Sequence, residues 1–182
     1  SPVKVLVTGA GGQLGVTICR TFALRHEVVA ATRAELDVTS HARVVDAVRD
    51  LQPEAIVNCA AYNDVDGAED DPVRAMRANT FGVRSLGLAA RGVGATLVHY
   101  GTDFVFDGTA TRPYVEEDSP NPQSVYAVSK LLGEWFARDT PQCYVLRVES
   151  LFGGAAVEPD ASRGVRGGTL DRMADAILDG RQ

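Results

Sequence analysis

A glycine-rich turn between an apolar run and an amphipathic segment is the feature that most constrains the fold of this chain. The run Val3–Thr8 is rich in β-branched residues and leads into Gly9–Gly15, with the sequence GAGGQLG. Apolar side chains then recur at helical spacing from Gly12 to about Arg25. Glycines in this place allow a tight turn, close approach of the backbone to a pyrophosphate, and close packing of the helix on the strand. The pattern predicts a strand, a dinucleotide-binding turn and a helix.

The rest of the chain repeats this alternation of short apolar runs with longer amphipathic ones. Strands separated by helical segments indicate βαβ units, and these build a parallel sheet that is covered on both faces. We therefore predict a doubly wound α/β fold of the Rossmann type. The expected strands are Val3–Thr8, His26–Ala31, Ala55–Asn58, Ala95–Gly101 and Cys143–Val148, and the expected helices run from Gly12 to Arg25, Ser40 to Leu51, Asp71 to Arg91, Ser124 to Arg138 and Gly168 to Gly180.

Local signals support several of these boundaries. Ser40 is a good N-cap residue, and Pro53 stops the helix that Ser40 begins. Asp71 and Pro72 have the residue types of an N-cap and a first helical position. Residues 103–123 contain three prolines and no clear periodicity, which predicts a long loop. Loops of that length in compact domains usually have a function.

Composition narrows the class of protein. The formal net charge is −6, and 45% of the residues are hydrophobic. An acidic balance argues against a general nucleic-acid binder, which needs a basic surface to displace counterions. The apolar runs fall short of the roughly 18 residues of a membrane span, and the start of the chain has too short an apolar core for a signal peptide. We expect a cytoplasmic protein that binds neither nucleic acid nor membrane.

The cysteines, histidines and acidic residues show no metal-ligand spacing. The three cysteines lie far apart without a CxxC pair, so reduced thiols are expected. Cys59 is expected to be a small core residue and His99 a packed polar residue of a strand. The acidic run from Asp64 to Asp71 is expected to be a solvated loop and a helix start. We predict no metal site.

The end of the second expected strand bears on the choice of dinucleotide. NAD selectivity normally uses an acid there to accept hydrogen bonds from the ribose hydroxyls. Here the strand ends in Ala31, Thr32 and Arg33, and the Arg33 guanidinium is suited to a 2′-phosphate. Glu35 or Asp37 remains a candidate for the missing acid. The sequence thus favours NADP(H) and leaves NAD(H) possible.

A tyrosine and a lysine four residues apart suggest acid–base chemistry. Tyr126 and Lys130 share one face of the helix expected from Ser124, while Leu131, Trp135 and their neighbours Leu132 and Phe136 are expected to anchor the opposite face. A nearby cation lowers the pKa of a tyrosine and makes the phenol a usable general acid. Thr102 adds a hydroxyl at the end of the preceding strand.

Taken together, these motifs resemble the extended short-chain dehydrogenase/reductases, and most closely the dTDP-4-dehydrorhamnose reductase branch. The resemblance covers most of the chain, and its specificity comes from the combination of motifs rather than from one of them. The matching segments are Thr8–Gly15, Asn58–Tyr62, Val65–Glu69, Asn79, His99–Gly108, Pro113–Glu116 and Tyr126–Glu134.

The resemblance implies a role for each of these segments. Tyr126 would protonate a sugar ketone while the nicotinamide delivers hydride, Thr102 would polarise the carbonyl, and Lys130 would bind the ribose and lower the pKa of Tyr126. Asn79 would be a structural or proton-relay residue within a helix, and a simple helix irregularity is the competing interpretation. The remaining implied contacts are Gly9, Gly12, Gln13, Leu14 and Gly15 at the pyrophosphate, Asp37 and Val38 at the adenine, Ala60, Ala61 and Tyr62 at the centre of the cofactor, Tyr100 on the nicotinamide side, and Asp103 at the substrate.

Departures from the family pattern leave alternatives open. Related dehydratases carry Thr-Asp-Glu, whereas Phe104 follows Thr102 and Asp103 here, which favours ketone reduction over elimination of water. The family typically reads Arg-Thr-Ser-Trp after the last strand, but this chain has Glu149 and Ser150 after Arg147 and Val148, so a different keto-sugar or small ketone is an alternative substrate. Some members hold magnesium through a glutamate early in the first helix, where this chain has Thr17. A dinucleotide-binding regulatory protein without turnover is the alternative from another functional class.

The expected organisation is a dinucleotide-binding domain over residues 1–152 that carries the catalytic residues. Residues 153–182 are expected to begin a substrate-binding lobe, with the sequence a fragment of a longer protein. The expected partner is a nucleotide sugar, and a homodimer is possible.

Overall fold

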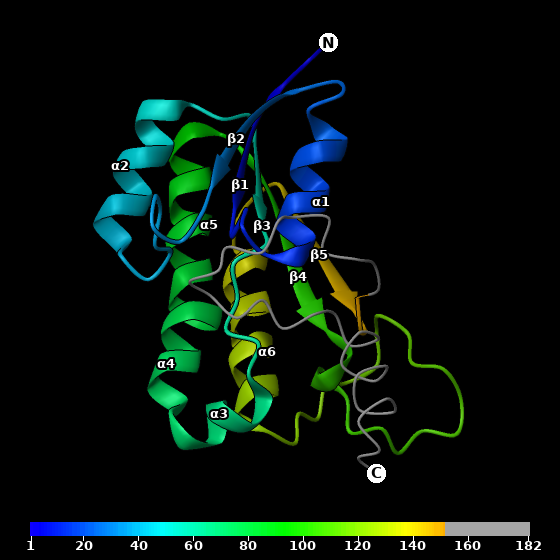
Figure 1. Cartoon of the computed structure of the whole chain (residues 1–182). Helices are drawn as coiled ribbons and strands as arrows, with labels where there is room; N and C mark the ends of the chain where they lie inside the picture. Colours follow the sequence, from blue (N-terminus) through cyan, green and yellow to red (C-terminus); the bar gives the residue numbers. More distant parts are fainter. Residues whose placement is uncertain (152–182) are drawn as a thin grey trace, which may run out of the picture.

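A parallel sheet of five strands in the order β2-β1-β3-β4-β5 forms the centre of the molecule (Figure 1). The computed structural model describes residues 1–151, so the expected helix from Gly168 to Gly180 lies outside the described residues. The doubly wound α/β fold is confirmed. The strands are β1 (Lys4–Thr8), β2 (Glu27–Ala31), β3 (Ala55–Asn58), β4 (Thr96–Thr102) and β5 (Cys143–Val148), and the α-helices are α1 (Gln13–Phe22), α2 (His41–Leu51), α3 (Val65–Asp70), α4 (Pro72–Met76), α5 (Gly82–Val93) and α6 (Val125–Arg138).

The strand order reverses direction beside β1, which pairs with β2 on one side and with β3 on the other. The register places Thr8 opposite both Ala31 and Asn58, and Asn58 opposite His99. The carboxyl ends of these strands therefore meet at one edge. In open α/β sheets, ligands bind in the crevice outside this edge, at the switch point.

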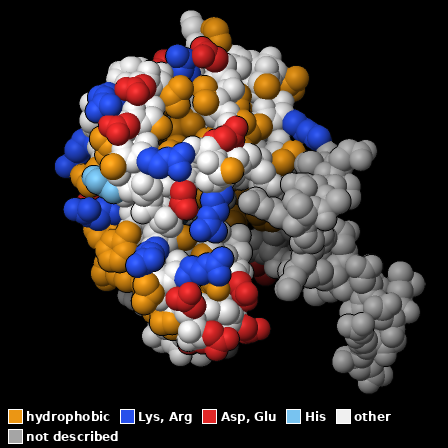
Figure 2. Space-filling view, turned by 60° about the vertical axis from the view of Figure 1, so that its left-hand side comes forward, with side chains coloured by type: hydrophobic (Ala, Val, Ile, Leu, Met, Phe, Trp, Pro, Cys, Tyr) orange, Lys and Arg blue, Asp and Glu red, His pale blue; other side chains and the backbone are white. Residues whose placement is uncertain are grey.

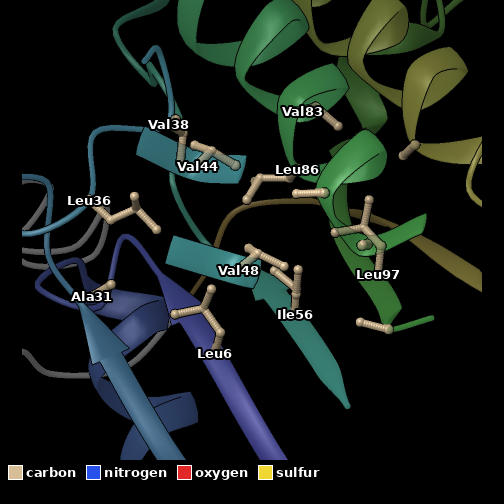
Figure 3. Packing of buried hydrophobic residues seen from close by; sticks show 14 residues of the cluster. Leu6, Ala31, Leu36, Val38, Val44, Val48, Ile56, Val83, Leu86 and Leu97 are labelled. Carbon is tan, nitrogen blue, oxygen red and sulfur yellow. The ribbon is translucent and has the colours of Figure 1, made fainter. Parts of the chain in front are cut away.

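Two apolar clusters cover the two faces of the sheet. Helices α2 and α5 pack on one face, where Leu6, Val48, Ile56 and Leu86 are fully buried (Figure 3). Helix α1 packs on the other face, against Val5, Val7 and Val57. The β-branched residues of the strands thus fill both sides, as a central parallel sheet requires.

Both residues predicted as N-caps, Ser40 and Asp71, occupy N-cap positions, and one of them makes the capping hydrogen bond. The Asp71 carboxylate accepts a hydrogen bond from Arg74 N at 3.0 Å, and the Ser124 hydroxyl accepts one from Ala127 N at 3.2 Å. Ser40 occupies the N-cap position of α2, but its hydroxyl makes no capping hydrogen bond, so this part of the prediction is wrong.

The structure corrects four further expectations. Helix α1 ends at Phe22 rather than Arg25. The acidic run contains a short helix, α3, which begins where the Asp64 carboxylate accepts from Gly67 N at 3.0 Å. The long helix expected from Asp71 to Arg91 is divided by a π-helical turn, Arg77–Phe81. Trp135 does not anchor α6, because 60% of it is exposed.

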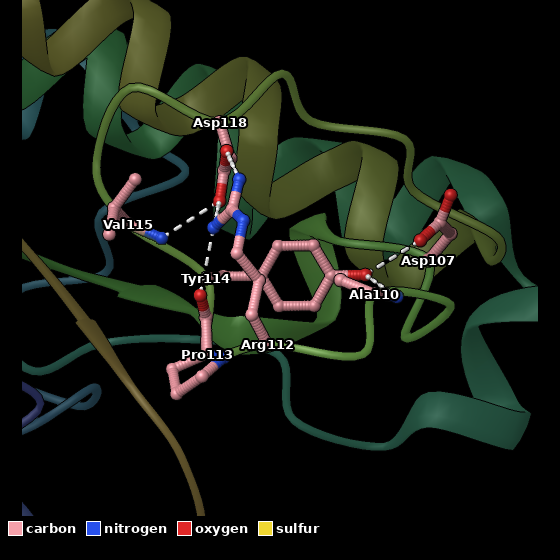
Figure 4. Close-up of polar contacts among 7 residues, drawn as sticks. All are labelled: Asp107, Ala110, Arg112, Pro113, Tyr114, Val115 and Asp118. Carbon is pink, nitrogen blue, oxygen red and sulfur yellow. Dashed lines mark hydrogen bonds and ion pairs between the residues drawn. The ribbon is translucent and has the colours of Figure 1, made fainter.

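The long loop after β4 is held by its own polar side chains (Figure 4). The Asp107 carboxylate accepts hydrogen bonds from Tyr114 Oη at 2.7 Å and from Thr109 N at 3.0 Å. These bonds, with those from Asn121 and the Thr109 hydroxyl, hold the pKa of Asp107 well below its usual range. Arg112 pairs with Asp118 through its two terminal guanidinium nitrogens: Nη2 lies 2.6 Å and Nη1 lies 2.9 Å from the carboxylate oxygens. The loop is therefore an ordered wall beside the end of β4.

Charged side chains of both signs are interspersed on the face that comes forward in Figure 2. On α2, for example, Arg49 pairs with Asp46 at 2.8 Å. Within residues 1–151, no helix is long and apolar enough to cross a membrane.

Candidate active site

The glycine turn leads directly from β1 into α1, and two of its glycines are required by close backbone contacts. Gly9 has φ +65°, and a Cβ on it would lie 2.6 Å from Ala60 N. A Cβ on Gly15 would run into the carbonyl oxygen of Gly9 and lie 2.8 Å from Ala10 Cα. The turn closes with a hydrogen bond from Gly12 N to Gly9 O at 3.0 Å. Side chains at Gly9 or Gly15 would therefore close this cradle.

The start of α1 suits an anion. Gly12 is the N-cap and contributes no side chain, and the first turn, which contains Gln13, Leu14 and Gly15, holds no acidic residue. Backbone N–H groups at a helix N-terminus and the helix dipole both attract phosphate. The cradle and this helix end together fit the pyrophosphate of a dinucleotide.

The turn after β2 lies beside the glycine turn, since a Cβ on Gly11 would be 3.6 Å from Thr32 Cγ2. Arg33 is 64% exposed and pairs with Asp37 at 3.5 Å. The Glu35 carboxylate instead accepts from Thr32 N and Thr32 Oγ1, at 2.7 and 2.8 Å. These two hydrogen bonds lower the pKa of Glu35.

Asp37 lies deeper in this turn. Partial burial raises the pKa of Asp37. Hydrogen bonds from Thr39 and the Arg33 guanidinium lower this pKa by more than burial raises it, so the net shift is downward. Val38 is buried and packs against the start of α5, where a Cβ on Gly82 would meet Val38 Cγ2 at 3.0 Å. The turn thus carries one exposed cation, Arg33, and two carboxylates, Glu35 and Asp37, that accept hydrogen bonds from neighbouring threonines.

The segment after β3 is fixed by the π-helical turn. Buried Asn79 accepts from Tyr62 N at 2.8 Å, and its amide donates to Tyr62 O at 2.9 Å and to Ser129 Oγ at 3.0 Å. Ala60 and Ala61 lie in this segment, half-buried beside the glycine turn. Both earlier interpretations of Asn79 hold in part, because the helix is irregular here and the amide has a structural role.

The catalytic candidates come together where β4 ends. Thr102 is 6% exposed, and its hydroxyl accepts from Phe104 N at 3.2 Å and donates to the Asp103 carboxylate at 3.2 Å. Tyr126 is 9% exposed and meets the Phe104 ring edge to face at 6.0 Å. The Thr102 hydroxyl is near enough to the Tyr126 phenol to lower its pKa. These are two hydroxyl groups and a carboxylate at one strand end.

Lys130 lies below this group and is 4% exposed. Its ammonium donates a hydrogen bond to Tyr100 O at 2.6 Å. Burial lowers the pKa of Lys130 to about 8, against the charge of Glu134, which raises it. Tyr126 and Lys130 therefore share a buried helix face, not a solvated one.

One electrostatic expectation is not met. Burial raises the pKa of Tyr126, the Thr102 hydrogen bond lowers it, and the Asp103 charge raises it. In this structure the Lys130 ammonium is directed at a backbone carbonyl rather than at the phenol. Tyr126 is therefore a protonated phenol at neutral pH, which is the form that a general acid needs.

A buried network behind these residues joins side chains to which the sequence analysis gave no role in the site. The Asn58 amide oxygen accepts from Thr8 Oγ1 at 2.8 Å and from Ala60 N at 3.1 Å, and its nitrogen lies 3.1 Å from His99 Nδ1. Burial and the Lys130 charge lower the pKa of His99 to about 3, so this histidine is neutral. Asn58 ends β3 at the switch point, and that position in the register is the signal that would have indicated it.

The other expectations concern reactive or ligating groups. His99 is a packed strand residue, as predicted, and burial raises the pKa of the half-buried Cys59 thiol to about 12, which suits an unreactive residue. Thr17 donates to Gln13 O at 3.1 Å within α1. In the part of the chain that the structure describes, no group of three or more His, Cys, Asp or Glu side chains is placed to hold a metal ion.

Comparison with known proteins agrees with this geometry. The model of the RmlD substrate binding domain family matches residues 3–161. A dTDP-4-dehydrorhamnose reductase of Burkholderia thailandensis is 43% identical over 138 residues, which are 76% of this chain and 46% of that protein. A spore coat polysaccharide biosynthesis protein of Bacillus subtilis is 38% identical over 152 residues, covering 82% of this chain and 54% of that protein. The chain spans about half the length of these curated relatives.

A solved structure gives the same result for the fold. The dTDP-4-dehydrorhamnose reductase of Bacillus anthracis in complex with NADP superposes with a TM-score of 0.88 at 29% identity, over 98% of this chain and 61% of that one. The resemblance to the dTDP-4-dehydrorhamnose reductases is thereby confirmed, whereas the short-chain dehydrogenase/reductase label is only approximate, because the matched family is related but distinct. The chain belongs to the RmlD substrate binding domain family.

Proposed function

We propose that this protein is an NAD(P)H-dependent reductase that acts on the 4-keto group of a deoxysugar nucleotide. The observation that carries the proposal is the meeting of Thr102, Tyr126 and Lys130 at the carboxyl end of β4, at the same sheet edge as the glycine cradle. The names of the relatives support the substrate class, since they include dTDP-4-dehydrorhamnose reductases.

Each side chain has a distinct task in this reaction. A bound nicotinamide dinucleotide supplies the hydride. The Thr102 hydroxyl hydrogen-bonds the ketone oxygen and polarises the carbonyl, and Tyr126 Oη donates the proton that completes the alcohol. Lys130 binds the ribose hydroxyls, and its ammonium would favour the phenolate that proton transfer leaves on Tyr126 only after turning from Tyr100 O toward the phenol. Asp103, beside Thr102, is placed to accept from a sugar hydroxyl.

The same edge of the sheet carries the residues that would hold the cofactor. Gly9, Gly12 and Gly15 shape the cradle, and the first turn of α1 would receive the pyrophosphate. Asp37 and Val38 would hold the adenosine half, and Ala60, Ala61 and Tyr62 would line the centre of the cofactor. Tyr100 would lie on the nicotinamide side. In this proposal residues 1–152 form the dinucleotide-binding domain and residues 153–182 begin the substrate-binding lobe.

We further propose that Arg33 makes the site prefer NADPH. Among residues 1–151, the ion-pair partner of its exposed guanidinium is Asp37 at 3.5 Å, a long contact that leaves the side chain able to turn to a 2′-phosphate. The variant Arg33→Ala is expected to raise the Kd for NADPH about 10-fold, because one charge-assisted contact is lost, and to leave the Kd for NADH unchanged. Titration calorimetry measures both constants.

The matched control for this variant is Arg49→Ala, since Arg49 is similarly exposed, at 61%, but lies on the outer side of α2. It should change neither constant. Tighter binding of NADH than of NADPH by the unaltered protein would contradict the preference and assign the ribose hydroxyls to Glu35 or Asp37.

A regulatory protein that binds dinucleotide without turnover is the second candidate. One observation favours it: the Lys130 ammonium donates its hydrogen bond to Tyr100 O and not to the Tyr126 phenol. The test is oxidation of NADPH by the full-length polypeptide with a panel of 4-keto deoxysugar nucleotides and small ketones. Turnover of a 4-keto-6-deoxysugar nucleotide supports the reductase, turnover of another ketone alone supports the alternative substrate suggested by exposed Glu149, and binding without turnover supports the regulatory protein.

A further inference from the structure

A buried ion pair lies one helical turn beyond Lys130. Glu134 is fully buried, and its carboxylate accepts from Arg147 Nε at 3.1 Å and from Arg147 Nη2 at 2.9 Å. The Arg147 guanidinium in turn lies over the Phe106 ring, 5.0 Å from its centroid. A buried charge pair of this kind contributes little net stability compared with apolar residues of the same volume. Its presence beside the proposed active site therefore invites a functional explanation.

The backbone of β4 is built to admit this carboxylate. A Cβ on Gly101 would run into Glu134 Oε1, and Gly101 pairs with Arg147 in the β4–β5 register. The preceding residue, Tyr100, provides the carbonyl that binds the Lys130 ammonium. Glu134 thus lies against Gly101 and Lys130 against Tyr100, which are consecutive residues of β4.

The other charged and titratable groups around Lys130 come from β4, α6 and β5. From β4, His99 has a pKa lowered to about 3 by burial and by the Lys130 charge, so it is neutral. From α6, the pKa of Tyr126 is raised by burial, so the phenol is protonated. The negative charge of Asp103 raises the pKa of Tyr126, and Arg147 on β5 forms an ion pair with Glu134. Arg138, 58% exposed, lies 3.8 Å from the same carboxylate.

We propose that Glu134 is a positioning residue, whose buried carboxylate, fixed by Arg147 against Gly101, keeps Lys130 in its ammonium form at the dinucleotide-binding edge. This inference rests on the proposed function, because it assigns Glu134 a task through the lysine of that site. Without a negative charge nearby, a larger share of an ammonium that is 4% exposed gives up its proton near neutral pH, since burial disfavours the charged form. The neutral fraction of the lysine would not bind ribose hydroxyls as a cation.

Removing the charge of Glu134 and removing the charge of Arg147 are expected to shift the Lys130 titration in opposite directions. Glu134→Gln keeps the shape of the side chain and removes the negative charge, so the Lys130 titration moves to lower pH, by about 1 pH unit. Arg147→Gln leaves the carboxylate without its main cation, so the same titration moves to higher pH. Loss of packing alone would move the two variants in the same direction or not at all.

Residues 1–182 are well suited to a direct measurement, because Lys4 and Lys130 are the two lysines in this part of the protein. Labelling lysine with ¹³C at the ε position gives a side-chain NMR signal for each of them, and the chemical shifts of these two signals are followed between about pH 6 and pH 11. Lys4 lies at the opposite end of the sheet, where its ammonium is 3.6 Å from Glu27, and serves as the internal reference. We expect the Lys130 midpoint to fall in Glu134→Gln, to rise in Arg147→Gln, and the Lys4 midpoint to stay constant.

Asp139→Asn is the matched control, because Asp139 is an exposed carboxylate at the C-cap of the same helix. It should leave the Lys130 midpoint unchanged. If Glu134→Gln does not fold, the double variant Glu134→Gln/Arg147→Gln removes the unpaired cation as well, and its Lys130 midpoint is expected to lie below that of Arg147→Gln, since these two variants differ only in the Glu134 charge, which raises the pKa of Lys130. Equal Lys130 midpoints in two folded proteins that differ only at Glu134, or shifts of the same sign in both single variants, would overturn the proposal. The titration uses no substrate, so an absence of turnover would count against the proposed function and leave this result standing.

Discussion

Tyr126→Phe is expected to lower kcat for keto-sugar reduction by about 10²- to 10⁴-fold, the usual contribution of a positioned general acid. The substitution removes the hydroxyl that donates the proton and keeps the ring. That ring is 9% exposed and meets Phe104 edge to face at 6.0 Å, so the packing of α6 survives. Steady-state oxidation of NADPH by the full-length polypeptide measures the loss, and the Kd for NADPH should remain close to its original value.

Tyr144→Phe is the control for this substitution. Tyr144 lies on β5 with 64% of its surface exposed, away from the group formed by Thr102, Tyr126 and Lys130. Its loss of a hydroxyl should leave kcat unchanged. If Tyr126→Phe retained more than about a tenth of the original kcat, another group would have to donate the proton.

Gly133→Ala is expected to cost about 3 kcal/mol of unfolding free energy, at the upper end of the usual cost of overpacking. Gly133 is the point where α6 lies against the π-helical turn, and a Cβ there would run into the backbone carbonyl oxygen of Asn79. Both partners are backbone, so neither side is able to yield by changing a rotamer. The substitution would push α6, with Tyr126 and Lys130, away from the segment that Asn79 fixes.

Gly92→Ala provides the comparison within helix α5. No atom of the described residues 1–151 lies within 4 Å of the position that a Cβ would take on Gly92. The same chemical change should therefore stabilise the protein by up to about 1 kcal/mol, because alanine loses less backbone entropy in a helix than glycine. Urea denaturation measures both variants. Equal stabilities for the two would show that α6 does not depend on a close approach at Gly133.

The regular part of the fold was predictable because each strand is a short β-branched run between turn residues. The bounds of β3 and β5 match the prediction, and the end of α4–α5 lies two residues from the expected one. Helix α3 was missed because it is short, contains Gly67 and is acidic, so propensity opposes it. Trp135 was misjudged because an apolar residue type does not specify which side of a helix is covered.

The candidate site was also predictable only in part. Spacing along one helix and one glycine turn was enough to predict that Tyr126 and Lys130 share a face and that a cradle opens after β1. Contacts between separate elements were not predictable, because the sequence does not specify which side chains meet across the sheet. The Glu134–Arg147 pair joins α6 to β5 and was not foreseen, and the Lys130 ammonium was expected near the phenol rather than at Tyr100 O.

The central claim is that this site transfers a hydride to a sugar carbonyl while Tyr126 supplies the proton. The most direct measurement uses NADPH that carries deuterium at the transferred position of the nicotinamide, the full-length polypeptide, and a dTDP-linked 4-keto-6-deoxysugar, with analysis of the product by NMR. The account predicts one deuterium at C4 of the sugar, in a product that Tyr126→Phe forms at least about 100-fold more slowly. Binding of both ligands without deuterium at C4 would contradict it.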